Sequence, residues 1–399
     1  MKKFTDFNFH MYTEMVFGKE VEKRVSELIL KYNGGKVMMV YGGGSMKKSG
    51  LYDTVAGELH AAKIPFIEFG GVQSNPRRSL VEKGIAIAQN EKIDFLLGIG
   101  GGSAIDTAKT IALGLVNDGD YWQFYNGVVP TKTAPVGAIP TIPATGSETS
   151  DSAVLIDDIE TGRKRGFHHA VTRPVFAIMN PELTYSVPLY QKSAGVADIL
   201  SHTIMRYFID ADCYLGDQFC ESLMRTVIKY GPVACACPTD YEAHAEIMLA
   251  ASFSHNNLMN TGRYTKNRGG EHALERQLSG FYDIPHGAGI SVVMPAWLQF
   301  IVNHGSEAQA ARVAQFGVKV FGVEPDMADV RGVANGGLKL FRTWLKSIGM
   351  PLTLKELEIP KEDLSDIIGR CIKDNGDVLA GYMPLDRKAV SEIFTSIVE

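Results

Sequence analysis

The chain has 399 residues, of which 45% are hydrophobic and 21% are charged, and its formal net charge is −5. This composition excludes a disordered chain, the length favours two domains over one, and the small acidic excess argues against a nucleic-acid partner. No apolar run approaches the length of a membrane span, and no apolar segment follows the N-terminal lysines as in a signal peptide, so we expect no membrane anchor.

The cysteines indicate the compartment. There are five of them, they contain no Cys-x2-Cys pair, and their number is odd. Reduced thiols explain this pattern more simply than a disulfide framework does. We therefore expect a cytoplasmic protein.

The first half of the chain alternates short apolar runs with helical stretches, which is the pattern of parallel α/β structure. Three runs are predicted to be buried strands, at residues 37–41, 64–69 and 94–99. Each run ends at or next to glycines, and a helix is predicted to follow the third strand at residues 104–113. These elements predict a Rossmann-like parallel sheet.

The turn after the third strand reads Gly100-Gly101-Gly102-Ser103. Glycines let a backbone approach a ligand closely, and the amides that open the following helix suit a pyrophosphate. The turn matches neither the Gly-x-Gly-x-x-Gly fingerprint nor a P-loop, and a purely structural turn would have a similar sequence. Asp106, early in the helix, would repel a phosphate, so we interpret it as a residue that orients the cofactor loop.

The turn after the first strand contains Gly43, Gly44 and Ser45 and is followed by Lys47 and Lys48. Dinucleotide folds that prefer NAD place an acidic residue where it accepts a hydroxyl of the adenosine ribose. This turn offers hydrogen-bond donors and positive charge instead. The turn therefore favours NADP over NAD as the cofactor.

A stretch rich in hydroxyl side chains, residues 139–150, comes next. Two prolines stiffen it, and Thr141, Thr145 and Ser147 offer donors without charge. Beside a phosphate-binding turn, this stretch is predicted to line the cofactor, although an ordinary loop has the same composition. Lys164 is predicted to neutralise cofactor charge, and a solvated lysine is the alternative.

Asp198 and His202 stand four residues apart in a segment whose apolar residues recur at helical spacing. That spacing puts a carboxylate and an imidazole on one face of a helix, close enough to hold one ion. Such a pair also occurs in proteins without a metal. Two later histidines, His272 and His286, complete a hypothetical ligand set that contains no sulfur.

On one continuous helix, His272 and His286 would be about 21 Å apart. Ligands of one metal lie about 2 Å from it, so the chain must bend between these histidines. Gly280 and Pro285 are placed to allow the bend. Three imidazoles and a carboxylate suit Fe(II), Zn(II), Co(II) or Mn(II), and the ligand type alone does not select among these ions.

From residue 189 onward the pattern is helical. Helices are predicted at residues 218–230, 241–257, 307–321, 338–347 and 361–372, with their apolar positions in the core. Residues 379–386 are predicted to be a loop.

Together these motifs resemble the iron-containing (group III) alcohol dehydrogenases, and most of all their butanol-dehydrogenase-like branch. The resemblance covers nearly the whole chain and rests on Gly100-Gly101-Gly102-Ser103-x2-Asp106-x2-Lys109, the stretch 140–148, Asp198-x3-His202, and His272 with His286. It implies the architecture of dehydroquinate synthase: an NAD(P)-binding α/β domain at residues 1–187, an all-helical metal-binding domain at residues 188–399, and the cofactor in the cleft between them.

The same resemblance implies the site residues. The metal, Fe(II) or Zn(II), would be held by Asp198, His202, His272 and His286. The cofactor would be lined by Gly101, Gly102, Ser103, Thr141, Thr145, Ser147 and Lys164.

The chain departs from the family pattern at Arg276, because the family commonly has a second histidine four residues after the third ligand, beside the substrate. If residues 272–276 are helical, Arg276 lies one turn beyond that ligand on the same face. Its guanidinium suits a carboxylate, sulfonate or phosphonate, so we predict a short aldehyde that carries an anionic group. The alternative is a plain aliphatic aldehyde, with Arg276 paired to Glu148, Glu271 or Asp283.

The leading prediction is therefore a metal-dependent aldehyde reductase, in reverse an alcohol dehydrogenase, that transfers hydride between NAD(P)H and a small aldehyde. We expect a homodimer with no nucleic-acid or membrane partner. One alternative is a lyase or cyclase resembling dehydroquinate synthase, which does not consume its NAD; stoichiometric oxidation of NAD(P)H by an aldehyde separates the two. Another is a non-catalytic nucleotide or metal sensor, which would bind cofactor without turnover.

Overall fold

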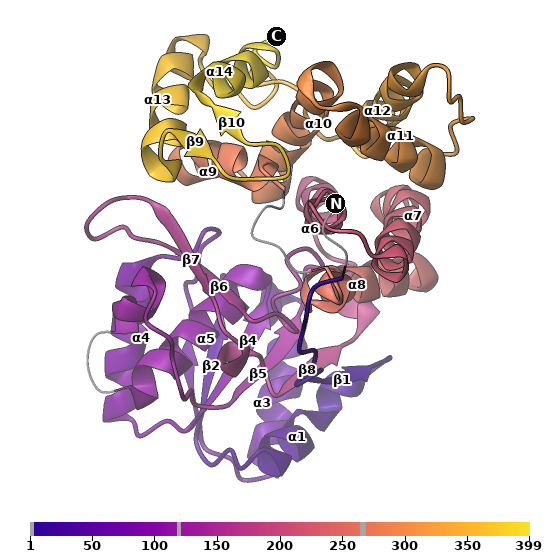
Figure 1. Cartoon of the computed structure of the whole chain (residues 1–399). Helices are drawn as coiled ribbons and strands as arrows, with labels where there is room; N and C mark the ends of the chain where they lie inside the picture. Colours follow the sequence, from indigo (N-terminus) through magenta and orange to yellow (C-terminus); the bar gives the residue numbers. More distant parts are fainter. Residues whose placement is uncertain (1–3, 118–120, 264–268) are drawn as a thin grey trace. The chain divides into compact units, whose positions relative to one another are not determined.

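The computed structural model describes residues 4–117, 121–263 and 269–399, which fall into two compact units (Figure 1). One unit, here the α/β unit, comprises residues 10–187 and 238–256. The other, the helical unit, comprises residues 1–9, 188–237 and 257–399. In the described part of the chain, every helix is too short or too polar to cross a membrane.

A six-stranded sheet lies at the centre of the α/β unit, in the order β1-β8-β5-β4-β2-β3, and all its pairs are parallel. The strands are β1 (Glu14–Phe17), β2 (Val37–Tyr41), β3 (Phe66–Phe69), β4 (Phe95–Gly100), β5 (Val136–Pro140) and β8 (Phe176–Met179). The chain runs from β2 outward to β3 and then returns to the other side of β2 as β4. The carboxyl ends of β2 and β4 are therefore the switch point at which open α/β sheets bind ligands.

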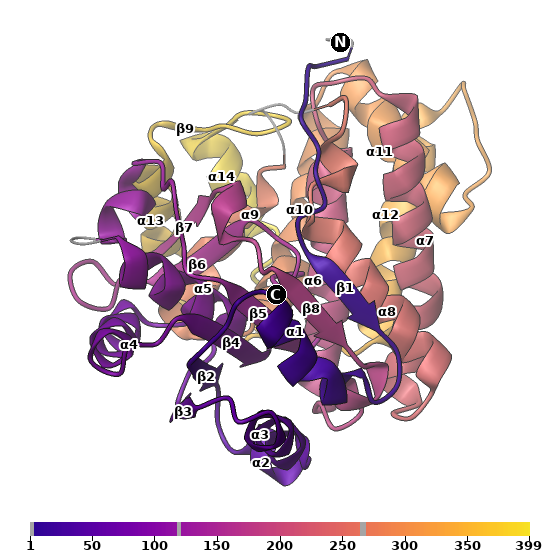
Figure 2. The ribbon, with the colours of Figure 1, turned by 90° about the horizontal axis from the view of Figure 1, so that it is seen from below.

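Helices cover both faces of this sheet. They are α1 (Val25–Lys31), α2 (Ser45–Lys48), α3 (Leu51–Ala61), α4 (Arg78–Asn90), α5 (Gly102–Val116) and α8 (Tyr241–His255). Successive residues of β2 point to opposite faces, so Met39 packs in one core with α1 and α3, and Met38 in the other with α4 and α5. Figure 2 shows the strands side by side between these two sets of helices. Burial on both faces explains why the predicted strands are continuous apolar runs.

An antiparallel hairpin also belongs to the α/β unit. It pairs β6 (Ser152–Ile156) with β7 (Lys164–His168). Ala153 and Leu155 of β6 are buried against the core that contains α5.

The helical unit contains α6 (Leu189–Tyr207), α7 (Tyr214–Ala236), α9 (Glu271–Tyr282), α10 (His286–His304), α11 (Glu307–Phe321), α12 (Val330–Ser347), α13 (Leu364–Asn375) and α14 (Arg387–Thr395). α11 shows why a helix was predictable locally. It begins at a capping box formed by Ser306 and Gln309, and it ends where Gly322 adopts a left-handed φ of 72°. The segment predicted to be a loop contains a two-residue ladder between β9 (Val378–Leu379) and β10 (Leu385–Asp386).

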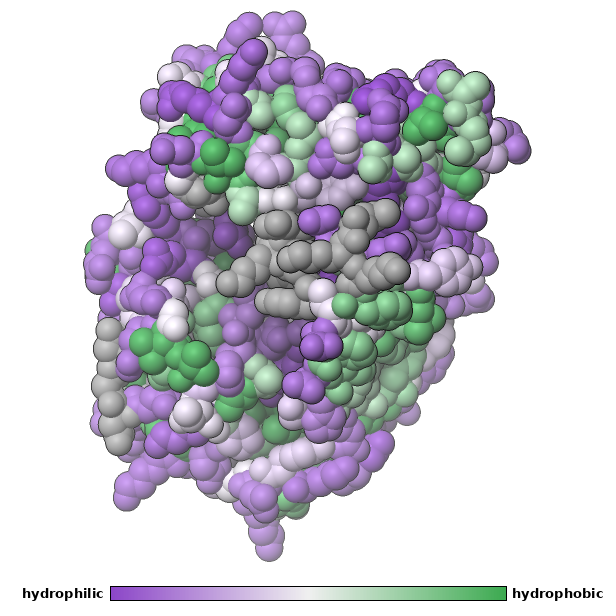
Figure 3. Space-filling view, in the orientation of Figure 1, coloured by the Kyte–Doolittle hydropathy of each residue, from purple (hydrophilic) through white to green (hydrophobic). Residues whose placement is uncertain are grey.

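One face of the molecule is mostly polar (Figure 3). On the face drawn in Figure 3, hydrophilic residues predominate and hydrophobic residues lie in separate groups. Scattered groups of this kind are normal on a protein surface and need no partner to explain them.

Candidate functional site

Three histidines from three helices of the helical unit gather around Asp198. Asp198 and His202 both lie on α6, and the Asp198 Oδ1 atom is 3.7 Å from His202 Nε2. The same oxygen is 3.7 Å from Nε2 of His286, the first residue of α10. Ligand atoms of Asp198, His202 and His272, which lies on α9, are all within 4.8 Å of one another. Two atoms at about 2.1 Å from one tetrahedral ion are about 3.4 Å apart, so this cluster fits a shared divalent ion.

A buried nitrogen of His272 lacks a protein partner. Its Nε2 atom is shielded from solvent, and no described residue forms a hydrogen bond with it. The ring of His272 stacks on that of His202, with centroids 5.6 Å apart, and lies 5.3 Å from that of His286. A buried polar atom without a partner costs free energy. An ion between these rings would satisfy the nitrogen, so the residues present fit a metal.

The bend between His272 and His286 lies at Asp283 to Pro285. α9 ends at Tyr282, Asp283 adopts a left-handed φ of 51°, and Pro285 precedes the first residue of α10. Proline suits this position because its fixed φ and missing N–H do not disturb the start of a helix. Gly280 lies inside α9, so its predicted part in the bend is wrong, since the helix continues through it.

A glycine brings α10 close to α6. A Cβ atom at Gly287 would overlap the backbone carbonyl of Ala194, one turn before Asp198 on α6. Only a residue without a side chain allows the two backbones to approach this closely. Gly287 therefore decides how near His286 comes to Asp198.

Two buried carboxylates that the sequence reasoning missed contact the histidines from behind. The Oε1 atom of Glu271 is 2.9 Å from Nδ1 of His272, and the Glu275 carboxylate contacts Nδ1 of His286. Both carboxylates are fully buried. At His272, the Glu271 acceptor fixes the proton on Nδ1 and leaves the lone pair on Nε2, as in carboxylate–histidine–metal arrangements. The available signal in the sequence was two acids close to the predicted ligand His272: Glu271 one residue before it and Glu275 three residues after it.

Arg276 lies on α9, one turn after His272, and its side chain is exposed. The protein around it nevertheless disfavours the charge, because burial lowers the pKa of the guanidinium and the nearby Glu275 only partly offsets this. None of the described residues forms an ion pair or a hydrogen bond with its guanidinium. Two of the three internal partners considered for Arg276 have other contacts: Glu271 contacts His272, and Glu148 accepts a hydrogen bond from Ser252. The arginine is thus accessible to a ligand.

In the α/β unit, the predicted cofactor residues lie on loops that pack together at the switch point. Gly101 precedes α5, and Gly102 and Ser103 open it. The backbone N–H of Thr141 donates to the carbonyl of Gly100 at 2.9 Å. A Cβ atom at Gly102 would overlap Thr145, so the glycine is needed for the second loop to lie on the helix start. The free amides at this helix start suit a phosphate.

Asp106 and Lys109 of α5 hold the hydroxyl-rich loop in place. The hydroxyl of Ser147 donates to Asp106 Oδ1 at 2.5 Å, and the Val154 N–H donates to Oδ2 at 3.0 Å. The Lys109 Nζ atom donates to the Ser147 hydroxyl at 2.9 Å and to the Ser150 carbonyl at 3.0 Å. Burial lowers the pKa of Lys109 to about 8 and raises the pKa of Asp106. These contacts orient the loop and leave Asp106 little capacity for a cofactor.

Gly43, Gly44 and Ser45 form the turn after β2 and are exposed. Tyr41 of β2 pairs with Ile99 of β4, so this turn and the Gly100 turn lie at the same sheet edge.

The charge beside that turn differs from the prediction in one respect. Lys47 forms an ion pair with Glu68 of β3 at 2.7 Å. Hydrogen bonds from Lys47, Tyr41 and Tyr52 lower the pKa of Glu68 to about 2. Lys47 is therefore already neutralised, whereas Lys48 forms no ion pair with any residue that the structure describes.

Lys164 begins β7, on the hairpin, and is half-buried. Its Nζ atom donates to the side-chain carbonyl of Asn75 at 3.1 Å.

The two units together have the components of one class of enzyme. A parallel sheet with glycine turns at its switch point is a dinucleotide-binding fold, and three imidazoles with one carboxylate suit a divalent ion that can accept a substrate oxygen as a fifth ligand. These features are those of a metal-dependent dehydrogenase that uses a nicotinamide cofactor.

Comparison with known proteins identifies the family. Residues 13–181 match the family described as iron-containing alcohol dehydrogenase, and residues 192–398 match its C-terminal domain family. The chain belongs to the iron-containing alcohol dehydrogenases, in the butanol-dehydrogenase-like branch.

Curated relatives extend over almost the full chain. NADH-dependent butanol dehydrogenase A of Clostridium acetobutylicum is 37% identical over 390 residues, 97% of this chain and 98% of that protein. NADPH-dependent aldehyde reductase YqhD of Escherichia coli is 32% identical over 356 residues, 88% of this chain and 89% of that protein. The crystal structure of NADH-dependent butanol dehydrogenase A from Thermotoga maritima matches with a TM-score of 0.92 at 32% identity, covering 100% of both chains.

These findings confirm the predicted fold class, family and reaction class. The chain is an NAD(P)-dependent alcohol dehydrogenase and aldehyde reductase of the iron type, and it uses a nicotinamide cofactor and a divalent metal.

Proposed function

We propose that Asp198, His202, His272 and His286 hold one divalent ion, Fe(II) or Zn(II), and that this cluster is the catalytic centre. The observation that supports it most is the buried Nε2 of His272, which faces the other ligand atoms and has no hydrogen-bond partner among the described residues. When bound, the ion supplies Lewis-acid polarisation of the substrate oxygen, and the nicotinamide carries the hydride.

The protein's own side chains prepare the centre for that chemistry. The Asp198 carboxylate offsets part of the charge of the ion, and Glu271 keeps the proton of the His272 imidazole on Nδ1. The Glu275 carboxylate contacts Nδ1 of His286. Replacing His272 with alanine should abolish turnover and metal binding while leaving cofactor binding intact. Near-normal turnover of metal-replete His272→Ala enzyme would contradict the assignment.

We further propose that residues 1–187 form the cofactor-binding domain and residues 188–399 the catalytic domain. The amides of Gly101, Gly102 and Ser103 would bind the pyrophosphate at the start of α5. The hydroxyl-rich loop that packs on it, with Thr141, Thr145 and Ser147, and the hairpin with Lys164 would line the rest of the dinucleotide.

For the choice of dinucleotide, we propose that NADPH is used at least as well as NADH. The turn Gly43-Gly44-Ser45 contains no acid, a side chain at Gly43 would meet open space, and Lys48 is available to a 2′-phosphate. The relatives include both NADH-dependent and NADPH-dependent enzymes. Steady-state kinetics with the two cofactors tests this preference, and a strong preference for NADH would contradict it.

We propose that the substrate is a short aldehyde with an anionic group that Arg276 binds. The accessible guanidinium one turn from a metal ligand supports this choice. Removing one partner of a buried charge pair costs about 2–5 kcal/mol of binding free energy. Because Arg276 is exposed, we expect a smaller loss when it is removed. A tenfold loss in kcat/KM corresponds to about 1.4 kcal/mol.

A matched substrate pair tests the role of Arg276. Butanal and 4-oxobutanoate have the same four-carbon chain, and only the second carries a carboxylate. Arg276→Ala should lower kcat/KM for 4-oxobutanoate by more than tenfold and spare butanal, whereas the exposed Arg387→Ala should change neither. Equal losses on both aldehydes, or a wild-type preference for butanal, would reject the proposal.

Finally, we propose a cytoplasmic homodimer. β1 lies at the edge of the sheet, and the exposed side chains of Met11 and Tyr12 precede it. An edge strand with apolar neighbours is a template for pairing with a second chain. Sedimentation equilibrium of the purified protein tests the dimer, and a monomer at micromolar concentration would refute it.

A further inference from the structure

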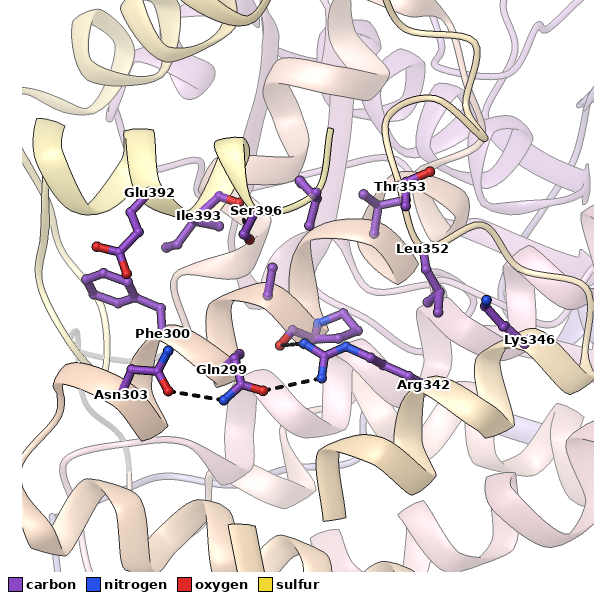
Figure 4. Close-up of a pocket in the computed structure, with 14 residues that line it drawn as sticks. Gln299, Phe300, Asn303, Arg342, Lys346, Leu352, Thr353, Glu392, Ile393 and Ser396 are labelled. Carbon is purple, nitrogen blue, oxygen red and sulfur yellow. Dashed lines mark hydrogen bonds between the residues drawn. The ribbon is translucent and has the colours of Figure 1, made fainter. Parts of the chain in front are cut away.

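A cavity of the helical unit lies away from the proposed metal ligands. It has a volume of about 320 Å³ and is lined by parts of α10, α12, α14 and the segment after α12 (Figure 4). None of the four metal ligands lines it. Val292, the lining residue of α10 nearest to His286, is about 9 Å from it along the helix at about 1.5 Å per residue, and Asn303 is about 25 Å from it. The cavity is therefore a separate site from the proposed catalytic centre.

One end of the cavity carries a cation with neutral partners. The half-buried guanidinium of Arg342 donates to the Gln299 Oε1 atom and to the Pro295 carbonyl, each at 3.3 Å, as Figure 4 shows. Gln299 is itself held with that oxygen toward Arg342, because its amide nitrogen donates to Asn303 and Asn335. An arginine has five N–H donors, so most of the guanidinium has no protein acceptor among the described residues.

The charge of Arg342 is also uncompensated. No carboxylate in the described part of the chain forms an ion pair with it, and Lys346, one turn later on α12, adds a second unpaired cation to the lining. Burial lowers the pKa of Arg342, which shows that its environment disfavours the charge. Charged groups that leave water are normally paired. A bound anion would supply the missing partner.

Apolar side chains form about half of the lining of the cavity. Val292, Ala296, Phe300, Leu352, Ile393 and Ile397 contribute side chains to its lining. The acid in the lining, Glu392, is already paired with His304 at 2.6 Å. A ligand for this cavity therefore combines an anionic head with an apolar body.

We propose that this cavity binds a medium-chain carboxylate, with its head on Arg342 beside Lys346 and its chain along the apolar wall. A planar guanidinium binds a carboxylate through two parallel hydrogen bonds. At about 30 Å³ per water-sized atom, the cavity holds about ten non-hydrogen atoms, the size of octanoate. The site goes beyond the proposed function, because it needs neither the metal nor Arg276.

Calorimetric titration of the metal-loaded enzyme with octanoate tests the proposal. We expect one binding site per chain, at least tenfold weaker binding in Arg342→Gln, and a smaller loss in Lys346→Gln. Lys339→Gln removes an exposed cation from the same helix outside the cavity and should bind as wild type does. Arg342→Lys keeps the charge but cannot form the two parallel hydrogen bonds, so its affinity should lie between those of wild type and Arg342→Gln. Octanamide, which has the same length and no charge, should bind at least tenfold more weakly than octanoate.

Two further measurements locate the ligand. Arg276→Ala should bind octanoate normally, and Arg342→Gln should reduce butanal at the wild-type rate, which also shows that the variant is folded. Loss of octanoate binding in Arg276→Ala would place the ligand at the catalytic centre and overturn the proposal. Equal affinity of wild type and folded Arg342→Gln would overturn it as well.

Discussion

The carboxylate of Glu271 offers a sharp test of how the metal centre is built. It is fully buried and lies 2.9 Å from Nδ1 of His272. We consider two substitutions, Glu271→Gln and Glu271→Ala. The first keeps the volume and a neutral acceptor, and the second removes the acceptor altogether. Both leave the proposed ligand itself unchanged.

The expected loss follows from the hydrogen bond that each variant retains. A hydrogen bond to a charged group is worth about 1.5–3 kcal/mol, and a neutral one about 1 kcal/mol. Glu271→Gln should therefore cost about 1–2 kcal/mol, or about 5-fold to 30-fold in metal affinity at about 1.4 kcal/mol per decade. Glu271→Ala leaves the Nδ1 hydrogen of His272 buried without an acceptor, so its loss should reach about 10-fold to 100-fold.

The measurement is metal affinity rather than activity. Competition with a chromogenic chelator at fixed pH gives the dissociation constant of Zn(II) for each variant, and circular dichroism confirms folding. Glu307→Gln is the control, because it removes a carboxylate that is 82% exposed from the same unit. Wild-type affinity in a folded Glu271→Ala variant would show that this carboxylate does not position the ligand.

Three other outcomes are expected. Gly287→Ala should lower metal affinity and reduce the free energy of unfolding by about 1–3 kcal/mol or more, because its Cβ overlaps the α6 backbone. Gly280→Ala, whose Cβ meets nothing within 4 Å, should instead stabilise the protein. Unfolding curves of the two variants test this difference. The pKa of Glu68 is lowered to about 2, so the stability that its ionised form adds is present above about pH 4.5 and is lost as the pH falls toward 2. The difference in unfolding temperature between wild type and Glu68→Gln should therefore shrink from about pH 4.5 to about pH 2. A constant difference would contradict this. Gly43→Asp should shift the cofactor preference toward NADH, since a carboxylate there would repel a 2′-phosphate; an unchanged ratio of kcat/KM values would show that this turn does not contact the ribose.

Features that depend on neighbours along the chain were predictable from the sequence. The strand at residues 37–41 was placed to the residue, because an apolar run buried on both faces stops abruptly at glycines. α11 was placed equally well, because its capping box and its terminal glycine are local signals. Asp198 and His202 were predicted to lie together because both stand on one turn of one helix.

Features that depend on packing between distant segments needed the tertiary structure. Helical periodicity alone does not tell which residue ends α9, so Gly280 was wrongly included in the bend that Asp283 and Pro285 form. The pairing of Lys47 with Glu68 arises because β3 lies beside β2, and neither residue carries a local sign of it.

The metal cluster itself shows the division between the two kinds of information. The sequence supplied the residue types of the proposed ligands and, through the family resemblance, the four residues proposed. It did not show that Gly287 lets α10 reach the α6 backbone, or that Glu271 and Glu275 are buried behind the imidazoles. Those contacts are set by how helices from distant parts of the chain pack, and close packing is a property of the whole core rather than of any one segment.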